Sequence, residues 1–224
     1  MKIAGAMAQR MRDASGHEVK VHLTLDREEA LKDADFATAQ FRAGLLPARI
    51  KDERIPLSYG MLGQEINGAG GMFKAFRTIP VIRSIVEDMK RLCPNAWLIN
   101  VTNPSGRVTE AVFKYGKWDR VVGLCNVPVE AMLREPNLID KKPEDLTYKF
   151  AGLNHFRWHR EWDETGREVT DDMIAGRLDP DKDDGTPANI FDVPFFEEQL
   201  KEMKMIPCGY HRYFITVRKK CSVI

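Results

Sequence analysis

The chain has 224 residues, which is enough to bury a sizeable core in one large domain or two small ones. Its 34 Lys and Arg residues nearly balance 33 Asp and Glu residues, and the formal net charge of +1 argues against a protein that holds nucleic acid or an anionic membrane by overall charge. No apolar run marks a signal peptide or a membrane helix, and the four cysteines form no CxxC pair. The sequence therefore predicts a cytoplasmic protein with reduced thiols.

The first part of the chain alternates between helix and strand patterns. Apolar spacing predicts a helix over 1–14, and alternation of apolar and polar residues predicts a strand over 19–25. Asp26, followed three residues later by a glutamate, has the capping-box spacing for a helix over 27–32, and 35–41 has the composition of another strand. This rhythm is typical of an α/β fold.

Residues 44–71 are polar and are interrupted by proline and glycine, and the segment is too long for an ordinary connection. We therefore expect a functional loop. Arg42, Arg49, Lys51 and Arg54 lie beside or within it, and such cations can hold a phosphate group. A solvated, salt-bridged loop is the alternative, and the spacing alone favours it because isolated basic residues are common on surfaces.

The regions around the centre of the chain show three further patterns. Residues 72–92 have the apolar stripe of a long helix, with a break expected near Pro80. Residues 150–153 have a strand pattern that leads directly to His155. After that strand the chain becomes charged, and 179–187 is predicted to be a flexible excursion.

The central segment has the pattern of a β-α-β unit. Residues 97–101 resemble a buried strand, 102–106 a turn, 108–115 a helix and 121–124 the next strand. Two strands joined in this way are parallel neighbours, and open α/β sheets bind ligands at the carboxyl ends of such strands. The polar residues at those ends are Asn103, Cys125 and Asn126.

Three ordered motifs carry a family resemblance. They are NVTNPSGRVTEAV at 100–112, GLCNVPV at 123–129 and AGLNH at 151–155, and the segment at 40–71 follows the same pattern. Together they resemble the NAD- and manganese-dependent glycoside hydrolase family 4, most closely its 6-phospho-β-glucosidase branch. The resemblance runs from about Val21 to Phe214.

This resemblance implies an α/β fold. We expect a Rossmann-like, mostly parallel sheet whose first strands are missing, in a partial NAD-binding domain over 1–150, followed by part of an α+β substrate domain over 151–224. The glycine-rich turn that grips a dinucleotide pyrophosphate is not in the sequence, and after Thr216 the sequence departs from the family. The chain is therefore expected to be truncated at both ends.

The implied reaction hydrolyses a 6-phospho-β-glucoside or a phosphorylated disaccharide, with NAD and Mn²⁺ as cofactors. Glycosidases of this family depart from two-carboxylate hydrolysis. Carbon 3 of the sugar is oxidised by hydride transfer to NAD, a base takes the proton from carbon 2, and the metal stabilises the resulting enediolate while the glycosidic oxygen leaves. Water then adds, and the hydride returns.

The resemblance assigns the metal ligands to Cys125 and His155. A thiolate and an imidazole can hold a divalent ion and leave positions open for substrate oxygens. Residue type alone would favour a structural thiol and a structural histidine. His159 and His211 are the alternative ligands.

The remaining site residues also follow from the resemblance. Tyr210 is the base, with Tyr213 as the alternative. The reference pKa of its phenol is about 10, and this pKa must be lowered for the residue to act as a base. Asn126 stands where the α-glycosidase branch has an aspartate acid, which favours the β branch. Glu65 is expected to tune the tyrosine, although an exposed salt bridge is the simpler account.

Substrate contacts are assigned to Arg49 and Arg42. Asn103 is expected to hydrogen-bond the substrate and to lie near the nicotinamide, against the alternative of a turn-forming asparagine.

Other readings of the chain stay open. One is an inactive, truncated fragment of such an enzyme, and another is a Rossmann-type 2-hydroxy acid dehydrogenase. For an intact enzyme of the family we also expect a homo-oligomer, with no nucleic-acid or membrane partner.

Overall fold

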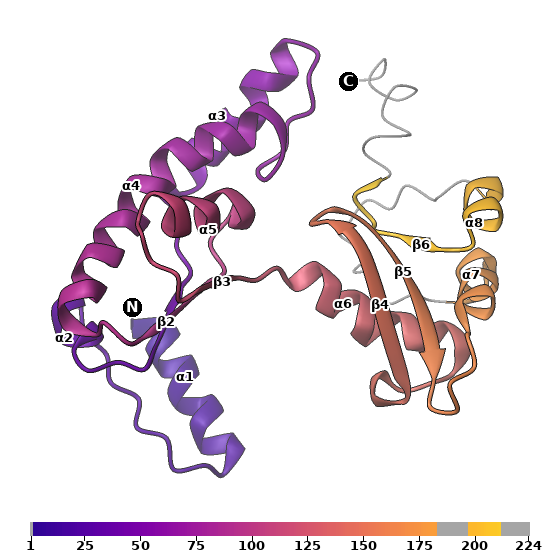
Figure 1. Ribbon diagram of the computed structural model, residues 1–224, viewed down its shortest axis with the longest axis horizontal. Coiled ribbons are helices and arrows are strands. Elements are labelled where there is room, and N and C mark those ends of the chain that lie inside the picture. Colours follow the sequence, from indigo (N-terminus) through magenta and orange to yellow (C-terminus); the bar gives the residue numbers. More distant parts are fainter. Residues whose placement is uncertain (1, 183–196, 212–224) are drawn as a thin grey trace. The chain divides into compact units, whose positions relative to one another are not determined.

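The computed structural model describes residues 2–182 and 197–211, and the chain forms two compact units. Unit 1 is Met1–Leu124 and unit 2 is Cys125–Ile224. Figure 1 shows both, with unit 1 in indigo to magenta. The proposed domain boundary after residue 150 stays a prediction. Tyr213, the alternative base, lies outside the described residues.

Unit 1 contains a parallel sheet with helices around it. Its elements in chain order are α1 (Lys2–Ser15), α2 (Arg27–Leu31), β1 (Phe36–Ala39), α3 (Leu45–Ser58), α4 (Gly68–Leu92), β2 (Trp97–Asn100), α5 (Ser105–Lys114) and β3 (Val121–Gly123). The sheet order is β1-β2-β3 and both pairings are parallel, with Thr38 opposite Ile99 and Leu98 opposite Val121. The predicted parallel β-α-β unit and α/β class are therefore confirmed.

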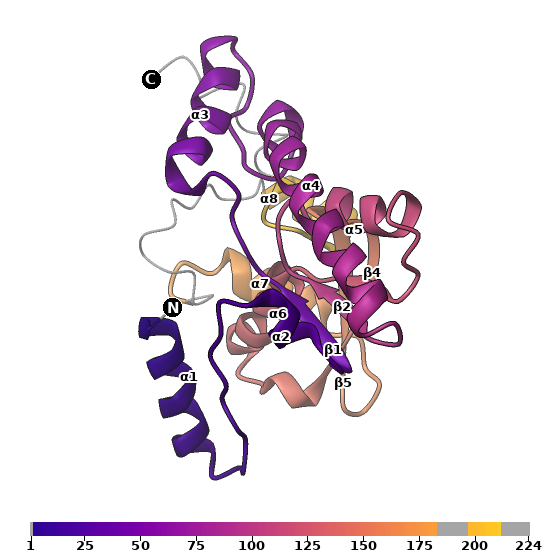
Figure 2. The same cartoon turned by 90° about the vertical axis from the view of Figure 1, so that its left-hand side faces the viewer.

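The core of unit 1 lies between this sheet and helices α2, α4 and α5. Helix α4 buries Ile82, Val86 and Met89, which are spaced about one helical turn apart. Figure 2 shows α4 running beside the sheet. The buried side chains of this core include Leu31, Ile82, Val86, Met89, Leu98, Val108 and Val112. Helix α2 begins as predicted, because the Asp26 carboxylate accepts hydrogen bonds from the backbone N–H groups of Glu28 and Glu29.

Three local predictions for unit 1 were wrong. Residues 19–25 form no strand, because their alternating pattern finds no partner strand and Val19 stays exposed. Half of the expected loop over 44–71 is helix α3, which begins after Gly44 in the left-handed conformation. Helix α4 continues through Pro80, which lies on the exposed side where water can bond the carbonyl left without a partner.

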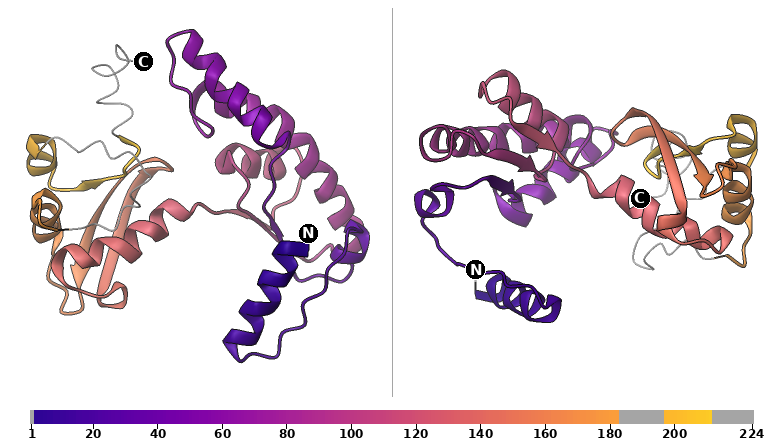
Figure 3. Two further views of the ribbon diagram at one scale, coloured as in Figure 1. Left: turned by 180° about the vertical axis from the view of Figure 1, so that it is seen from behind. Right: turned by 60° about the horizontal axis from the view of Figure 1, so that its bottom comes forward.

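Unit 2 is built on an antiparallel sheet. Its elements are α6 (Asn126–Arg134), η1 (Glu135–Ile139), η2 (Pro143–Asp145), β4 (Leu146–Leu153), β5 (Phe156–Asp163), α7 (Thr170–Leu178), α8 (Glu197–Met203) and β6 (Ile206–Pro207). The sheet order is β4-β5-β6, and a small apolar core joins η1, β4, α7, α8 and β6. Figure 3 shows α7 and α8 side by side next to this sheet.

The charged stretch after β5 contains a helix. Residues 170–178 form α7, which buries Met173 and Ile174 in the core of unit 2. The rest of the predicted excursion, from residue 183 onward, lies outside the described residues.

Candidate functional site

The two predicted metal ligands meet in unit 2. Cys125 caps the N-terminus of α6, and His155 lies in the two-residue turn between β4 and β5. Cys125 Sγ is 3.4 Å from His155 Nε2. Ligand atoms bound to one ion at about 2.0–2.3 Å lie roughly 3–4 Å apart, so both atoms can reach a common ion with little movement.

The hairpin turn that presents His155 depends on its backbone. His155 adopts a φ of 64°, in the left-handed region that a histidine rarely occupies. Gly152 has a φ of 114°, and a Cβ there would lie 2.5 Å from the carbonyl oxygen of Phe156. Only glycine therefore fits at 152, and the turn projects the imidazole inward, where His155 is 2% exposed.

The electrostatic surroundings favour a neutral His155. Burial, and then the positive charge of Arg157, lower the pKa of His155. The neutral imidazole is the form that binds metals. His155 Nδ1 is buried and has no hydrogen-bond partner among the described residues.

Tyr210 lies against the same imidazole. Its ring stacks on His155 with centroids 3.9 Å apart and planes 23° apart. Tyr210 follows β6, whose Ile206 pairs with His159, so the sheet holds both aromatic rings together. The structure thus brings three predicted residues, Cys125, His155 and Tyr210, into one cluster.

Asn126 and His211 also lie in unit 2. Asn126 is exposed and its amide donates to the Glu130 carboxylate one turn along α6. His211 is buried and stacks on Phe156 with centroids 4.6 Å apart. Neither side chain has a described contact with Cys125 or His155, and their assigned roles stay predictions.

A second predicted group forms in unit 1 around Glu65. Arg42 and Lys74 both donate to Glu65 Oε1, and Arg49 Nη1 lies 3.5 Å from Glu65 Oε2. Arg49 Nε also donates to Glu53 over 2.7 Å, one turn away on α3. Three cations therefore converge on one carboxylate, and the assignment of Arg42 and Arg49 to substrate contacts stays a prediction.

Burial and charge act in opposite directions at Glu65. Burial alone would raise the pKa of Glu65, but hydrogen bonds from Lys74 and Arg42 outweigh it, and the pKa lies below its ordinary value. Burial lowers the pKa of Lys74, and Glu65 offsets only part of this effect. The expected influence of Glu65 on Tyr210 connects the two units and stays a prediction.

Asn103 lies at the carboxyl end of β2, directly before the cis peptide bond to Pro104. The neighbouring Asn100 is fully buried, and its amide donates to Thr109 Oγ1 over 3.1 Å while its carbonyl accepts from the Thr102 N–H. These bonds hold the turn after β2. They place Asn103 at the sheet edge where α/β folds bind ligands.

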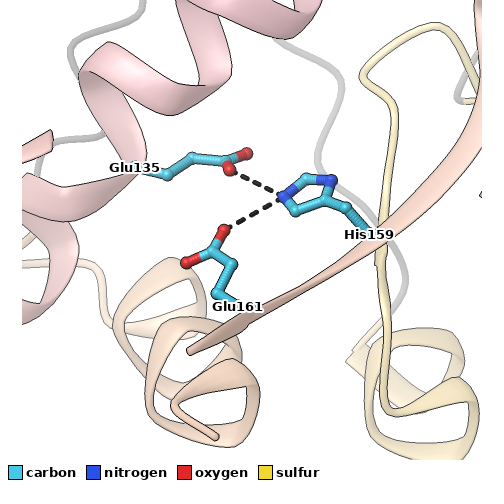
Figure 4. Close-up of side chains that lie close together, drawn as sticks. All are labelled: Glu135, His159 and Glu161. Atoms are coloured by element: carbon cyan, nitrogen blue, oxygen red, sulfur yellow. Dashed lines mark hydrogen bonds and ion pairs between the residues drawn. The ribbon is translucent and has the colours of Figure 1, made fainter. Parts of the chain in front are cut away.

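Two groups of residues were missed. Lys74 lies on the buried stripe of α4, where a charged residue among apolar ones was a readable signal. On β5 the inward positions are all charged or ionisable, and they are Arg157, His159, Glu161 and Asp163. Their period-2 spacing within a strand marked one face, and of the four only His159 had been named, as an alternative metal ligand. Figure 4 shows that His159 and Glu161 meet Glu135 of η1.

Comparison with known proteins places the chain in a family. The model for "Family 4 glycosyl hydrolase" matches residues 1–135, and the model for "Family 4 glycosyl hydrolase C-terminal domain" matches residues 150–222. A probable 6-phospho-beta-glucosidase of Bacillus subtilis (strain 168) is 48% identical over 219 residues, which cover 98% of this chain and 49% of that protein. The 6-phospho-beta-glucosidase of Escherichia coli (strain K12) is 46% identical over 222 residues, which cover 97% of this chain and 48% of that protein.

A solved structure shares the fold. The 6-phospho-beta glucosidase of Thermotoga maritima, with manganese, NAD+ and glucose-6-phosphate, superposes with a TM-score of 0.75 at 31% identity over 89% of this chain and 47% of that one. The chain spans about half the length of the curated relatives it matches. No helix in the described part of the chain combines the length and apolar character of a membrane span. The family match covers more than half of the residues, and the chain belongs to glycosyl hydrolase family 4.

Proposed function

We propose that this chain provides the metal and substrate residues of a 6-phospho-β-glucosidase that depends on NAD and Mn²⁺. The observation that carries the proposal is the cluster in unit 2, in which Cys125 Sγ lies 3.4 Å from His155 Nε2 and Tyr210 stacks on the same ring. The relatives described above from Bacillus subtilis and Escherichia coli are named a probable 6-phospho-beta-glucosidase and a 6-phospho-beta-glucosidase. Membership of family 4 disfavours the 2-hydroxy acid dehydrogenase.

The residues present fit a divalent metal. Cys125 and His155 offer one sulfur and one nitrogen that lie 3.4 Å apart, and the lowered pKa of His155 favours the neutral ring that binds metals. Two protein ligands leave coordination positions for hydroxyl oxygens of a sugar. A metal bound there would act as a Lewis acid that stabilises negative charge on those oxygens.

Tyr210 is the proposed base. Its ring lies parallel to the imidazole, so its phenol belongs to the same cluster as the metal ligands. A base must reach the proton it removes within hydrogen-bond distance, and the stack fixes the position of the Tyr210 ring for that task. Asn126 follows Cys125 directly in the sequence and stays the proposed neighbour of the leaving group.

Unit 1 offers cations for an anionic substrate. Arg42, Arg49 and Lys74 surround Glu65, so the positive charges exceed the charge of that carboxylate. Arginine forks suit phosphate oxygens, and a phosphate group on the sugar would find donors already held in place. We propose Arg49 and Arg42 as phosphate-binding residues, with Asn103 as a further substrate contact.

The dinucleotide is the less supported cofactor. Asn103 at the carboxyl end of β2 is the residue that we assign near the nicotinamide. In residues 2–182 and 197–211 no strand leads into a glycine-rich turn of the G-x-G-x-x-G type. The homo-oligomer also stays a proposal. A cytoplasmic location is proposed because a metal-binding thiolate at Cys125 needs a reducing compartment.

The test measures metal binding and turnover separately. Titration of the full chain with Mn²⁺ should show binding that Cys125→Ser and His155→Ala each weaken at least ~10–100-fold, whereas the matched control Cys93→Ala, in the core of unit 1, should bind as the wild type does. A chromogenic 6-phospho-β-glucoside with NAD and Mn²⁺ should then be hydrolysed, and its α-anomer should not.

The outcomes separate the proposal from its alternative. Mn²⁺ binding that is equal in all four proteins would remove Cys125 and His155 as ligands. Metal binding without NAD-dependent turnover, in a chain shown to be folded, would favour the inactive fragment.

A further inference from the structure

A buried ionisable cluster in unit 2 has no part in the proposed reaction. Glu135 of η1 and two residues of β5, His159 and Glu161, point toward one another, as Figure 4 shows. His159 Nε2 lies 2.8 Å from Glu135 Oε2 and 3.1 Å from Glu161 Oε1. The three residues are 6%, 2% and 0% exposed. Two carboxylates thus approach one imidazole nitrogen in a site without solvent.

The ligand types at first suggest a metal site. One atom from each residue lies within 4.8 Å of the others, and a nitrogen with two carboxylate oxygens can bind a divalent ion. The groups behind the cluster argue against this reading. A metal-bound histidine normally donates its other ring N–H to an acceptor, but His159 Nδ1 faces Arg157 Nη1 at 3.4 Å, and a guanidinium has only donors.

Arg157 instead fixes the tautomer of His159. Because Nδ1 accepts from the guanidinium, the ring proton of the neutral imidazole must lie on Nε2, between the two carboxylates. One N–H cannot satisfy both. Glu135 has a second cation, since Arg177 Nη2 donates to Glu135 Oε1 over 2.6 Å. Glu161 Oε2 is buried and has no partner among the described residues.

Glu161 is therefore the group whose negative charge is least compensated. A charge buried without a partner costs several kcal/mol, and a carboxyl group escapes this cost by keeping its proton. We propose that Glu135, His159 and Glu161 hold one additional shared proton at neutral pH, centred on Glu161, and that this proton locks η1 and α7 to strand β5. The proposal does not depend on the proposed function.

The pKa directions agree with the geometry. Burial, and then the charge of Glu135, raise the pKa of Glu161 to about 7. Burial opposes ionisation of Glu135 as well, but His159 and Arg177 outweigh it and lower the pKa of Glu135 to about 2. Burial would lower the pKa of His159, yet the two carboxylates raise it. His159 and Glu161 therefore both hold a proton more tightly than they do in the unfolded chain.

Among the described residues, no lysine or arginine has a contact with the Glu161 carboxylate. The charged and titratable groups that face the cluster are Arg157 on β5, Arg177 on α7, Tyr148 on β4 and Cys208 after β6. Burial, and then Glu161 and Glu135, raise the pKa of Tyr148, so its phenol stays neutral. Burial likewise raises the pKa of the Cys208 thiol. Both arginines contact other members of the cluster.

The sign of the pH dependence follows. The ordinary pKa of the Glu161 carboxyl is 4.5 and its folded value is about 7, so between these values the folded unit binds more protons than the unfolded chain. Stability from this proton is complete below about pH 4.5 and is lost as the pH rises through about 7. Unit 2 should therefore loosen around η1, β5 and α7 on the alkaline side of neutrality.

Hydrogen exchange on the metal-free full chain tests the proposal. After correction for intrinsic rates, protection of the β5 and α7 amides should fall about tenfold between about pH 6 and pH 8 in the wild type. Glu161→Gln keeps an N–H donor in place of the shared proton and cannot titrate, so its protection should not change with pH. The matched control Glu144→Gln, exposed on η2, should behave as the wild type does.

A second measurement applies even if Glu161→Gln fails to fold. The infrared carbonyl band of a protonated carboxylic acid should be present in wild-type protein at about pH 6 and should disappear with a midpoint near pH 7. Its absence at pH 6 would overturn the proposal. So would a stabilisation by Zn²⁺ or Mn²⁺ in Cys125→Ser/His155→Ala protein that Glu161→Gln removes, because the cluster would then be a metal site.

Discussion

The two units each contain a buried ionisable cluster, and the clusters have opposite composition. In unit 1 three cations surround one carboxylate, Glu65. In unit 2 two carboxylates approach one imidazole, that of His159. Both are built from long-range contacts between a helix and another element, and both lie where an apolar residue would have cost less to bury.

The difference shows what each cluster lacks. Around Glu65 positive charge is in excess, so an added anion such as a sugar phosphate completes the group. Around His159 the second oxygen of the Glu161 carboxylate has no partner among the described residues, so an added proton completes it. Two sites with similar burial therefore take ligands of opposite charge, and the charge count of each cluster decides which.

The largest expected effect comes from removing the shared partner in unit 1. Glu65→Ala leaves Lys74, whose side chain is 4% exposed, as a buried cation beside Arg42 and Arg49. Breaking a buried pair in this way costs about 3 kcal/mol of the free energy of unfolding. Urea denaturation at neutral pH measures it.

The control for this variant uses the neighbouring surface pair. Glu53→Ala breaks only the partly exposed bond to Arg49 and should cost about 0.5 kcal/mol. Equal losses of unfolding free energy in the two variants would mean that Glu65 does not hold the cluster of unit 1 together. The contrast drawn between the clusters of the two units would then not hold.

Sequence patterns predicted the parts of the fold that local signals specify. The cap at Asp26 fixed the start of α2, and the two apolar runs around 97 and 121 gave the parallel pair β2 and β3. Each of these elements depends on residues within one turn or one strand, so the local sequence is enough to predict it.

The misses arise where tertiary contacts decide. Apolar residues of helix α3 such as Leu46 and Ile50 are exposed. The apolar residues of this helix do not gather on one buried face, which is the pattern that predicts a helix from sequence. The strand pattern at 19–25 lacks a partner, and no local signal reveals that. The Glu135 cluster joins residues 24 positions apart in sequence, so its burial became visible only with the fold.

A smaller effect is expected on ligand affinity. Arg49→Ala should weaken binding of glucose 6-phosphate to the full chain about tenfold, or about 1.4 kcal/mol, because one charge-assisted donor is lost. Calorimetric titration measures the affinity. Arg83→Ala, an exposed arginine on α4, should leave it unchanged, as should Glu161→Gln in unit 2. Identical affinities for all three variants would exclude the Glu65 cluster as the phosphate site.

The smallest effect concerns acid, where the two clusters should separate. The pKa of Glu65 lies below its ordinary 4.5, because the bonds from Lys74 and Arg42 outweigh burial. The stability it contributes is therefore present above about pH 4.5 and is lost as the pH falls through the folded pKa. Hydrogen exchange of the α4 amides should accelerate in acid in the wild type but not in Glu65→Gln, which carries no titrating carboxyl. Glu161→Gln should leave this acid response of α4 intact while it removes the alkaline response of β5. If one variant altered both the acid response of α4 and the alkaline response of β5, the two clusters would not be independent. Each response is expected to depend only on the charge balance within its own unit.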